Sequence, residues 1–525
     1  MRIRIVGAGA MGRGIAQWAA TAGHTVELCD VRTEAVTAAV EFVRSMLERA
    51  VQKGRMSAED STAALDRLIP LDDPWAGGPD IELVIEAVRE DLDTKTEVFG
   101  RLEQALPATA VFATNTSSLS VTRIAAALKD PTRLAGLHFF NPVPLMKIVE
   151  IVPGAATRPE IPPALTALVE SCGHRAVTVA DTPGFLVNHA GRGLVTEALA
   201  LLEETVTDPA GIDRIARDVL GLRMGPFELM DLTGLDVTAA VIDSIWQGFR
   251  YADRLRPSYL TPNRVAAGLH GRKTGRGWFD HGPEAPSPDP EPPVTGDADR
   301  PVFVHGAAPQ NQDAAALRAA LTAAGAVVET GAEPSADAVV LIPVWGTTVA
   351  SEVAAHGLPA GRTFGVDPLL PVGRRRVLAV TPAADPAAAR DARAVLARAA
   401  GGDGDGDGDG PYAVSVVRDT AGSVAQRLLA SIVSVAASIA ERSIATPADI
   451  DLAVTAGLGY PVGPLAWGDR IGAARMLELH RALHRTTGDP RHRPSRWVTE
   501  RAQLGLPLTA PGTSPADCTA GTAPS

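Results

Sequence analysis

The most informative chemistry in the sequence is a histidine and a glutamate twelve residues apart. His138 precedes two phenylalanines and an Asn-Pro turn, and because proline lacks an N–H donor and restricts the residue before it, a strand must end near His138. Glu150 lies inside the apolar run 148–152, which predicts a buried strand. A buried carboxylate needs a partner, and a carboxylate that binds one imidazole nitrogen leaves the other as a general base. The alternative is an ordinary core histidine and an unrelated glutamate on an edge strand.

A cofactor signal at the start of the chain favours the catalytic interpretation. Residues 3–6 predict a short strand that leads into a Gly-x-Gly-x-x-Gly segment and a helix over 13–22. In such segments the glycines permit a tight turn, close approach of a pyrophosphate and close helix–strand packing, while the helix N-terminus donates N–H groups to the phosphates. The cofactor-binding residues predicted there are Gly7, Ala8, Gly9, Ala10, Met11 and Gly12.

Asp30 ends the next predicted strand, over residues 25–29. Its distance from the glycines is roughly the 20 residues expected for a carboxylate that binds the adenosine ribose 2′-OH. The pattern therefore favours NAD over NADP, with Arg32 as the one feature that points the other way. The alternative is a glycine turn of some other α/β protein, with Asp30 as a helix cap.

Length and composition limit the class of protein. A chain of 525 residues is too long for one core, and 46% hydrophobic with 21% charged residues is typical of soluble globular proteins. Three cysteines without metal or redox spacing, a strand beginning at residue 3 and no apolar run of about 18 residues predict a cytoplasmic protein without a signal peptide, disulfide framework, metal site or membrane span. A net charge of −12 disfavours nucleic-acid binding.

Several charged and hydroxyl side chains lie where a ligand could bind. Lys53 and Arg55 flank a predicted turn and form either a solvated basic surface or a contact for an anionic substrate tail. Glu90 and Lys95 follow the strand predicted at 81–87; surface charge is the ordinary interpretation, but open α/β sheets bind ligands at the carboxyl ends of their strands. Ser118, after the strand predicted at 111–113, is expected to cap the next helix.

These segments, together with residues 181–188, 224–231 and 273–279, resemble the 3-hydroxyacyl-CoA dehydrogenases of β-oxidation. The resemblance implies NAD-dependent oxidation of (S)-3-hydroxyacyl-CoA to 3-oxoacyl-CoA, with His138 as general base and Glu150 holding and polarising it. It further implies that Ser117 and Asn188 contact the substrate's oxygens, and that Asp30, Glu90, Lys95 and Asn141 line the cofactor site. Arg89 departs from the family pattern beside the ribose contacts. The matching segments occur in family order over residues 1–280, at 7–12, 86–90, 115–119, 138–142, Glu150, 181–188, 224–231 and 273–279.

The second half of the chain repeats part of the first. Residues 419–472 match residues 181–234 at a constant offset of 238 without a gap. Apolar segments at 302–304, 338–342 and 377–380 alternate with alanine-rich helices like a second nucleotide-binding domain. Its chemistry is lost, because residues 305–310 replace the glycine segment and no second His-Phe-Phe-Asn-Pro occurs. If Pro153 is aligned with Pro382, the counterpart of Glu150 falls near Ala379, and Gln426 replaces Asn188.

The predicted fold is an α/β Rossmann-type domain followed by an all-α domain, with the pair duplicated in degenerate form. Members of the resembled family pair through their helical domains, so the second half could pack on the first as a pseudo-dimer with one active site, and a homo-oligomer stays open. The predicted parts are an NAD-binding domain (1–180), a helical substrate and dimerisation domain (181–280), a Pro-rich linker (281–300), a degenerate Rossmann-like domain (301–400), a flexible Asp-Gly loop (401–410), a second helical domain (411–506) and a disordered tail (507–525).

Two other functions fit the same scaffold. One is an NAD-dependent dehydrogenase of a free 3-hydroxy acid or sugar acid, and the other is a non-catalytic nucleotide-binding module, which the intact set His138, Glu150, Ser117 and Asn188 argues against. A fused hydratase is disfavoured because the degenerate repeat accounts for residues 301–410. The long duplicated form is similar to enzymes of bacterial aromatic-acid catabolism such as the phenylacetate route, which implies a short dicarboxylic acyl group. The residues themselves do not select an acyl chain, since a methylene in an apolar pocket discriminates by only about 1–3 kcal/mol.

Overall fold

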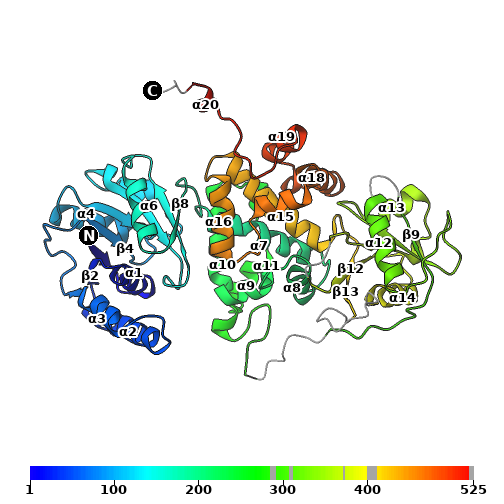
Figure 1. The fold of residues 1–525 in the computed structure, drawn as a ribbon, viewed down its shortest axis with the longest axis horizontal. Helices are drawn as coiled ribbons and strands as arrows, with labels where there is room; N and C mark the ends of the chain where they lie inside the picture. The colour runs from blue at the N-terminus through cyan, green and yellow to red at the C-terminus, as the bar shows by residue number, and fades with distance from the viewer. Residues whose placement is uncertain (284–290, 307–310, 370–372, 399–410, 520–525) are drawn as a thin grey trace. The chain divides into compact units, whose positions relative to one another are not determined.

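The computed structural model describes residues 1–283, 291–306, 311–369, 373–398 and 411–519 (Figure 1). The predicted Asp-Gly loop and residues 307–310 of the lost glycine segment lie outside these ranges. Within them the chain forms two compact units. The first contains Met1–His189 together with Arg442–Leu458, and the second contains Ala190–Glu441 together with Gly459–Ser525.

The first unit is built on an eight-stranded sheet of order β3-β2-β1-β4-β5-β6-β7-β8. All neighbouring strands are parallel except β6 and β7. The strand order changes direction between β1 and β4, the arrangement that places ligands at the carboxyl ends of the strands. The strands are β1 (Arg2–Val6), β2 (Thr25–Cys29), β3 (Leu68–Leu71), β4 (Leu83–Glu86), β5 (Val111–Thr114), β6 (Leu134–Phe139), β7 (Ile148–Pro153) and β8 (Arg175–Thr178).

Helices flank this sheet and bury its apolar strands. β4 and β6 are buried along their whole length, as expected for strands covered on both faces. The helix α16 comes from the second half of the chain and contacts β7 and β8. The helices of the unit are α1 (Ala10–Thr21), α2 (Thr33–Gln52), α3 (Ala58–Asp66), α4 (Leu92–Ala105), α5 (Val121–Ala125), η1 (Pro131–Arg133), α6 (Ile161–Ser171) and α16 (Pro447–Leu458).

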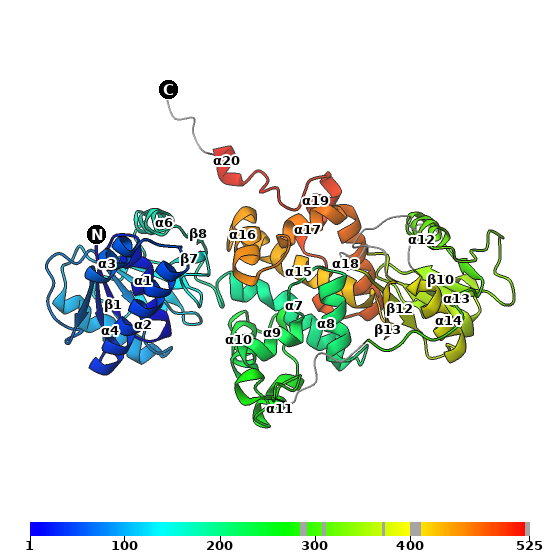
Figure 2. The same ribbon diagram turned by 60° about the horizontal axis from the view of Figure 1, so that its bottom comes forward.

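The second unit combines helices with a smaller, five-stranded sheet of order β13-β12-β11-β10-β9 (Figure 2). Its strands are parallel except for the pair β11 and β12. The strands are β9 (Val302–Val304), β10 (Val339–Pro343), β11 (Thr363–Val366), β12 (Arg375–Val380) and β13 (Ala413–Arg418), flanked by α12 (Asn311–Ala323), α13 (Val349–His356), η4 (Ala360–Arg362) and α14 (Pro386–Ala397). The other helices are α7 (Val187–Glu203), which begins in the first unit, α8 (Pro209–Asp218), α9 (Pro226–Thr233), α10 (Leu235–Gly248), η2 (Asp253–Leu255), α11 (Leu260–Ala266), η3 (Arg272–Thr274), α15 (Ser423–Glu441), α17 (Pro464–Ile471), α18 (Ala473–Thr487), η5 (Pro490–His492), α19 (Arg496–Leu504) and α20 (Pro515–Thr519).

The fold confirms the predicted duplication of a Rossmann-type domain followed by helices, and it corrects two boundaries. β13 pairs with β12, so the second helical segment begins after Arg418 and not at residue 411. The tail predicted to be disordered from residue 507 starts with ordered chain. Leu508 is fully buried, and the backbone N–H groups of Leu508 and Thr509 donate to Asp469. Composition alone does not reveal this anchor, because it depends on a carboxylate about forty residues earlier.

The last four strands of the two sheets share one topology. β5 to β8 pair parallel, antiparallel and parallel, and β10 to β13 repeat these pairings. Asp181 accepts N–H groups at the start of α5, and Asp419, its counterpart in the repeat, accepts them at the start of α13. The second sheet is therefore a shortened copy of the first, aligned by these two aspartates.

The strand registers identify what replaces the predicted catalytic residues. Counting back from the two aspartates through the paired strands aligns β8, β7, β6 and β5 with β13, β12, β11 and β10. The expectation that the counterpart of Glu150 lies near Ala379 is wrong by two residues, because it aligned prolines outside the shared register. The replacements are Asp367 for His138, Val377 for Glu150, Trp345 for Ser117 and, as predicted, Gln426 for Asn188.

A buried ionic cluster joins the two helical segments within the second unit. Arg427 on α15 donates to Glu197 on α7 at 2.6 Å, and both side chains are 1% exposed. Arg427 also donates to Glu204 at 2.8 Å. Burial alone would raise the pKa of Glu197, but the charges of Arg427, His492 and Arg491 outweigh it and lower the pKa to about 2. Glu197 is therefore ionised in the folded protein.

The helix α15 lies in the interior of this unit, against α8, α17, α18 and α19. By length and composition it could cross a membrane, but 94% of its most apolar window is buried inside the protein. It has the pattern of a core helix whose charged residue is compensated by buried partners.

Replacing Glu197 with Gln is expected to destabilise the second unit. Removal of one member of a buried ion pair typically costs about 3–5 kcal/mol, because the remaining charge stays buried. The measurement is the urea midpoint followed by circular dichroism. Glu203→Gln, on the same helix and without an ion pair among the described residues, is the matched control. Equal midpoints for the two variants would contradict a stabilising role of the pair.

Candidate active site

The glycine segment has the geometry that dinucleotide binding requires. Gly7 has φ +107°, and a Cβ there would lie 2.5 Å from the Ala87 carbonyl oxygen. A Cβ on Gly12 would lie 1.7 Å from the Gly7 oxygen, so the first turn of α1 packs directly on the loop. Around Gly9 no atom lies within 4 Å of the corresponding position. The segment therefore combines a tight turn with open access to backbone at a helix N-terminus, which fits a pyrophosphate.

Asp30 lies directly after β2 and beside the glycine segment. Its carboxylate accepts the N–H of Ala8 at 2.9 Å and that of Arg32 at 3.0 Å. The Arg32 side chain is 73% exposed, with Nε 3.7 Å from Asp30. Asp30 thus stands where a ribose carboxylate is expected, and the residues present fit NAD. The ribose contact itself stays a prediction.

Glu90 and Lys95 belong to a charge cluster at the carboxyl end of β4, in which Lys95 is buried and Glu90 is partly exposed. Lys95 is 1% exposed, and its Nζ lies 2.6 Å from Glu86 and 3.4 Å from Glu90. The ordinary interpretation of Lys95 as a surface charge is therefore wrong. Glu86 is fully buried and also accepts from Thr114 Oγ1. Burial raises the pKa of Glu86, against the opposing effect of Lys95. Contact of Lys95 with the cofactor stays a prediction.

Glu90 organises the loop that follows β5. One of its carboxylate oxygens accepts from Thr116 Oγ1 at 2.7 Å and from the backbone N–H groups of Ser117 and Ser118 at 2.8 Å each. Burial alone would raise the pKa of Glu90, but Lys95 and these hydrogen bonds lower it to about 2. Ser118 does not cap the next helix as expected, because its hydroxyl donates to Glu90 and Ser120 is the cap of α5.

The predicted histidine and glutamate meet across neighbouring strands. His138 on β6 is directly opposite Glu150 on β7, and His138 Nδ1 lies 2.6 Å from Glu150 Oε2. The histidine side chain is 6% exposed and the glutamate is fully buried. β6 ends at Phe139, one residue after the histidine, as the Asn-Pro turn predicts. Of the two nitrogens of the His138 ring, only Nδ1 has a hydrogen-bond partner among the described residues.

The other oxygen of Glu150 lies at the start of α7. It accepts the N–H groups of Leu186 at 3.0 Å and Val187 at 2.8 Å. These donors belong to the positive end of the helix macrodipole, which stabilises a carboxylate. Asn188, half-buried, follows in the first turn of the same helix. One carboxylate therefore orients the imidazole and fixes the helix that carries Asn188.

The ends of β5 and β6 link the loop held by Glu90 to the His138–Glu150 pair. Asn115, which precedes the serine loop, accepts the backbone N–H of Phe139 at 2.8 Å. Ser117 therefore lies on a loop tied to the strand that carries His138. Asn141, Lys53 and Arg55 are exposed, the first in the turn after β6 and the other two after α2, and their ligand contacts stay predictions.

Three site residues had no role assigned from the sequence. They are Glu86 beneath Lys95, Asn115 between β5 and β6, and Phe185, whose ring lies 5.7 Å from that of His138. The sequence carried a usable signal for Glu86 alone, because it is a carboxylate in a buried apolar strand, as Glu150 is. Contacts of an asparagine amide or an aromatic ring depend on the fold.

The fold and the site together define a class. A Rossmann-type sheet with a glycine segment at β1, a carboxylate after β2 and a buried imidazole–carboxylate pair at the carboxyl edge is the arrangement of an NAD-dependent dehydrogenase. The family model for the NAD binding domain of 3-hydroxyacyl-CoA dehydrogenase matches residues 2–182, and the model for the C-terminal domain matches residues 184–281 and again 422–513. The chain belongs to the 3-hydroxyacyl-CoA dehydrogenase family and is an NAD-dependent oxidoreductase.

Known proteins similar to this chain include both long and short forms. A 3-hydroxyadipyl-CoA dehydrogenase of Escherichia coli K12 is 34% identical over 96% of this chain and 97% of its own length. A crystal structure of a 3-hydroxybutyryl-CoA dehydrogenase from Escherichia coli K12 substr. MG1655 matches with a TM-score of 0.82 and 34% identity, over 96% of this chain and 98% of that one. A probable 3-hydroxybutyryl-CoA dehydrogenase of Bacillus subtilis, 37% identical, covers 53% of this chain with 97% of its own length.

Replacing Glu90 with Gln is expected to flatten the loss of stability in acid. The pKa of Glu90 is lowered to about 2 in the folded protein, whereas glutamate titrates near about 4.3 when unfolded. Its contribution is therefore complete above about pH 4.3 and is lost as the pH falls towards about 2. Melting temperatures between about pH 5 and about pH 2 should fall more steeply for the wild type than for Glu90→Gln.

The matched control for this titration is Glu97→Gln, an exposed glutamate on the neighbouring helix α4. Its melting temperatures should follow those of the wild type throughout the acid range. Parallel curves for wild type and Glu90→Gln would contradict the ionised, hydrogen-bonded state assigned to Glu90.

Proposed function

We propose that the chain catalyses NAD-dependent oxidation of (S)-3-hydroxyacyl-CoA to 3-oxoacyl-CoA, with His138 as the general base polarised by Glu150. The observation that carries the proposal is the 2.6 Å contact between His138 Nδ1 and Glu150 Oε2 in a buried setting. A carboxylate at Nδ1 favours the tautomer in which that nitrogen holds the proton. Nε2 is then the free acceptor for the proton of the substrate's 3-hydroxyl.

Glu150 is suited to this role because both of its carboxylate oxygens have hydrogen-bond partners. One oxygen faces the imidazole and the other accepts two N–H groups at the start of α7. When His138 takes up the hydroxyl proton, the neighbouring carboxylate stabilises the imidazolium that forms. The rings of Phe140 and Phe185 lie 4.5 and 5.7 Å from the imidazole and limit water around it.

The remaining residues of the set would orient the substrate and cofactor. NAD, when bound, supplies the acceptor for the hydride that leaves the carbon of the alcohol. We assign Ser117 and Asn188 to the oxygens of the substrate, since the first lies on a loop tied to β6 and the second on the helix start fixed by Glu150. Asp30, Glu90, Lys95 and Asn141 are assigned to the cofactor side, with Glu90 holding the serine loop in place.

We also propose that the two halves of the chain mimic a dimer. The backbone N–H of Ala180 donates to Ile444 at 2.8 Å, and the N–H of Arg418 donates to Val206 at 2.9 Å. Adding the repeat offset of 238 to 180 and 206 gives 418 and 444, so the second contact is the first with the halves exchanged. In a two-fold assembly every contact occurs twice in this reciprocal way.

Close packing of α7 against α15 supports the same proposal. A Cβ on Gly193 would lie 2.9 Å from the Ser431 carbonyl oxygen, and Ser431 is the repeat counterpart of Gly193. A residue meets its own counterpart only near a two-fold axis. On the outer sides, α16 contacts β7 just as α8 contacts β12. Each sheet is thus flanked by a helix from the other half.

For the acyl group we propose a short chain. A relative that spans 96% of this chain is named a 3-hydroxyadipyl-CoA dehydrogenase, and a similar solved structure is named a 3-hydroxybutyryl-CoA dehydrogenase. Comparing kcat/KM for 3-hydroxybutyryl-CoA and 3-hydroxyadipyl-CoA decides between a monocarboxylic and a dicarboxylic group.

For the compartment we propose the reducing cytoplasm, because the three cysteines lack metal or redox spacing.

Replacing His138 with Ala is expected to lower kcat by about 10²–10⁴-fold, the usual worth of a positioned general base. Glu150→Gln should also lower kcat, because the amide keeps the shape of the side chain but loses the charge that stabilises the imidazolium. The measurement is the absorbance of NADH during reduction of acetoacetyl-CoA.

The control for these variants is Glu170→Gln, an exposed position on α6, which should keep wild-type turnover. NADH binding, followed by fluorescence, should be retained in all of them, because neither His138 nor Glu150 is assigned to the cofactor. Wild-type turnover in His138→Ala would refute the assignment of the base.

Cutting the chain after residue 281 is expected to make the first half self-associate. The fragment keeps the whole first helical match but exposes the surface of α7 that packs on α15. Analytical ultracentrifugation should show dimers or larger species, whereas the full chain serves as the reference. A fragment that is soluble, monomeric and fully active would rule out the pseudo-dimer.

A further inference from the structure

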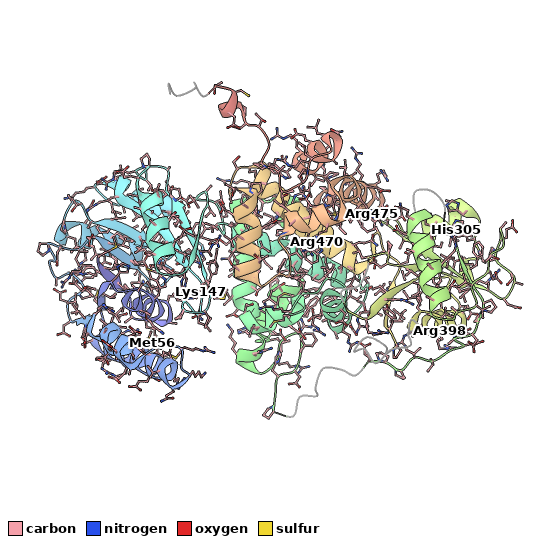
Figure 3. All side chains as sticks on the ribbon, viewed as in Figure 1. Met56, Lys147, His305, Arg398, Arg470 and Arg475 are labelled. Atoms are coloured by element: carbon pink, nitrogen blue, oxygen red, sulfur yellow. The ribbon has the colours of Figure 1, made fainter. Side chains whose placement is uncertain are left out.

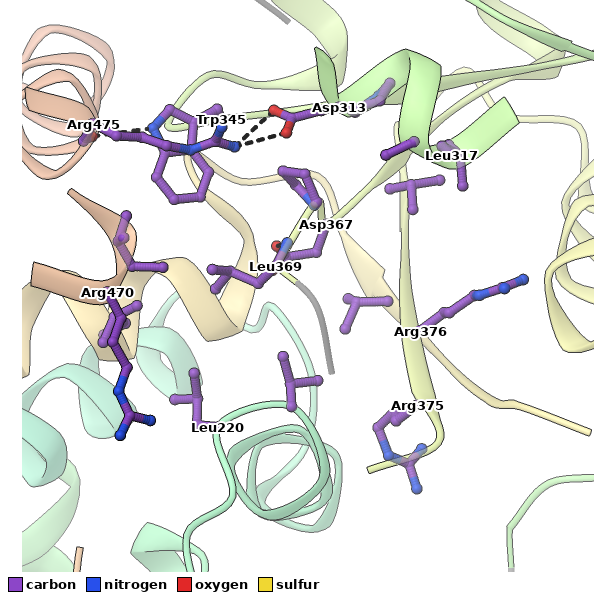
Figure 4. Close-up of a pocket in the computed structure, with 18 of the residues that line it drawn as sticks. Leu220, Asp313, Leu317, Trp345, Asp367, Leu369, Arg375, Arg376, Arg470 and Arg475 are labelled. Carbon is purple, nitrogen blue, oxygen red and sulfur yellow. Dashed lines mark hydrogen bonds and ion pairs between the residues drawn. The ribbon is translucent and has the colours of Figure 1, made fainter. Parts of the chain in front are cut away.

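A cavity of about 630 Å³ lies in the second unit, at the carboxyl edge of the second sheet (Figure 4). Trp345 follows β10, Asp367 and Leu369 follow β11, and Val377 lies on β12. Leu220, after α8, closes one side. The volume falls within the range of roughly 300–1,000 Å³ that small-molecule sites occupy.

This cavity occupies the place of the active site in the degenerate half. Three of its lining residues, Trp345, Asp367 and Val377, are the register counterparts of Ser117, His138 and Glu150. The imidazole and its carboxylate are therefore absent at these positions, and two of the replacements are apolar. The cavity lacks the pair of groups that we assign to proton transfer in the first half, which fits binding without turnover.

Asp367 presents a polar atom in this cavity. Its Oδ1 accepts the N–H of Leu369 at 2.9 Å and the amide of Gln426 at 3.0 Å. Its Oδ2 is buried, and the buried hydroxyl of Ser423 is a hydrogen-bonding neighbour of this carboxyl. Burial raises the pKa of Asp367 to about 6, against the opposing effect of the hydrogen bonds from Leu369, Gln426 and Ser423.

The cations of the cavity differ in their partners. Arg475 donates to both oxygens of Asp313 at 2.8 Å, and Arg375 pairs with Asp218 and Glu291. Arg470, on α17, makes no ion pair within the described ranges. Arg470 and Arg475 are both labelled in Figure 3, and Figure 4 shows that the Arg470 side chain extends away from the Arg475–Asp313 pair. Arg376, the fourth arginine of the cavity, donates to the Leu396 carbonyl oxygen at 2.8 Å and lies over the ring of Tyr412. Of the four, only Arg470 makes neither an ion pair nor a side-chain hydrogen bond among the described residues, so its exposed guanidinium is available to an anion.

We propose that this cavity is a second ligand site, which holds an acyl chain among Leu220, Leu369 and Trp345 and an anionic group at Arg470. An aliphatic carboxylate and an acyl thioester of CoA share this chemistry, the anion being a carboxylate in the first and a phosphate in the second. The apolar wall provides burial of the chain, and a guanidinium binds either anion in a planar, two-pronged contact. The site is separate from the catalytic one and does not depend on turnover.

The test is calorimetric titration of the full chain with octanoate, octanol and acetoacetyl-CoA. Arg470→Gln is compared with Arg481→Gln, an exposed arginine on α18 that does not line the cavity. We expect Arg470→Gln to weaken octanoate binding by about 3- to 10-fold, as for loss of one charge-assisted contact. Octanol binding should be unchanged, and Arg481→Gln should match the wild type for every ligand.

The two ligand sources give different results. Weaker octanoate binding in Arg470→Gln supports a site for a free carboxylate. Unchanged octanoate binding, with weakening of one of two bound equivalents of acetoacetyl-CoA, supports a site for an acyl-CoA. Ligand-induced change of tryptophan emission that disappears in Trp345→Phe would locate either ligand in the cavity. If Arg470→Gln and Arg481→Gln bind all three ligands alike, the proposal is wrong.

Discussion

The buried carboxylate of Glu150 is the constraint on which the site of the first half depends. A fully buried charge is tolerated only when it is compensated, and here the compensation comes from two directions. The imidazole of His138 faces one oxygen, and the first N–H groups of α7 face the other. The charge of Glu150 is therefore compensated only when β6 and β7 pair in this register and α7 begins beside Glu150. The chemistry of the site and the packing of the domain rest on the same contacts.

The second half shows what the scaffold becomes without that constraint. Val377 occupies the place of Glu150 and needs no compensation, and Asp367 with Gln426 occupies the places of the histidine and the asparagine. The strand pairings and the aspartate that caps the following helix persist. This half therefore keeps the backbone pairings and the Asp419 cap of the first half, whereas the residues at its carboxyl edge differ.

The sequence predicted the features that depend on local pattern. The glycine segment, the strand end after His138 and the ungapped repeat all follow from spacing, turn chemistry and register along one chain. The sequence did not predict contacts that a side chain makes with a residue brought near it only by the fold. Ser118 binds Glu90 instead of capping a helix, Lys95 is buried under two glutamates, and Leu508 is anchored by Asp469. The counterpart of Glu150 was misplaced because aligned prolines gave a different register from the paired strands.

The second half, which has lost the catalytic residues, contributes a helix to the unit that carries His138 and Glu150. α16, from the second half, packs on β7, the strand that carries Glu150, and a Cβ on its Gly457 would lie 3.1 Å from the side chain of Val187 at the start of α7. α16 therefore contacts both the strand that carries Glu150 and the helix start whose N–H groups bind it. A separate partner chain would occupy these contacts to an extent that depends on its concentration. A covalently joined half is present at a high effective concentration in every molecule.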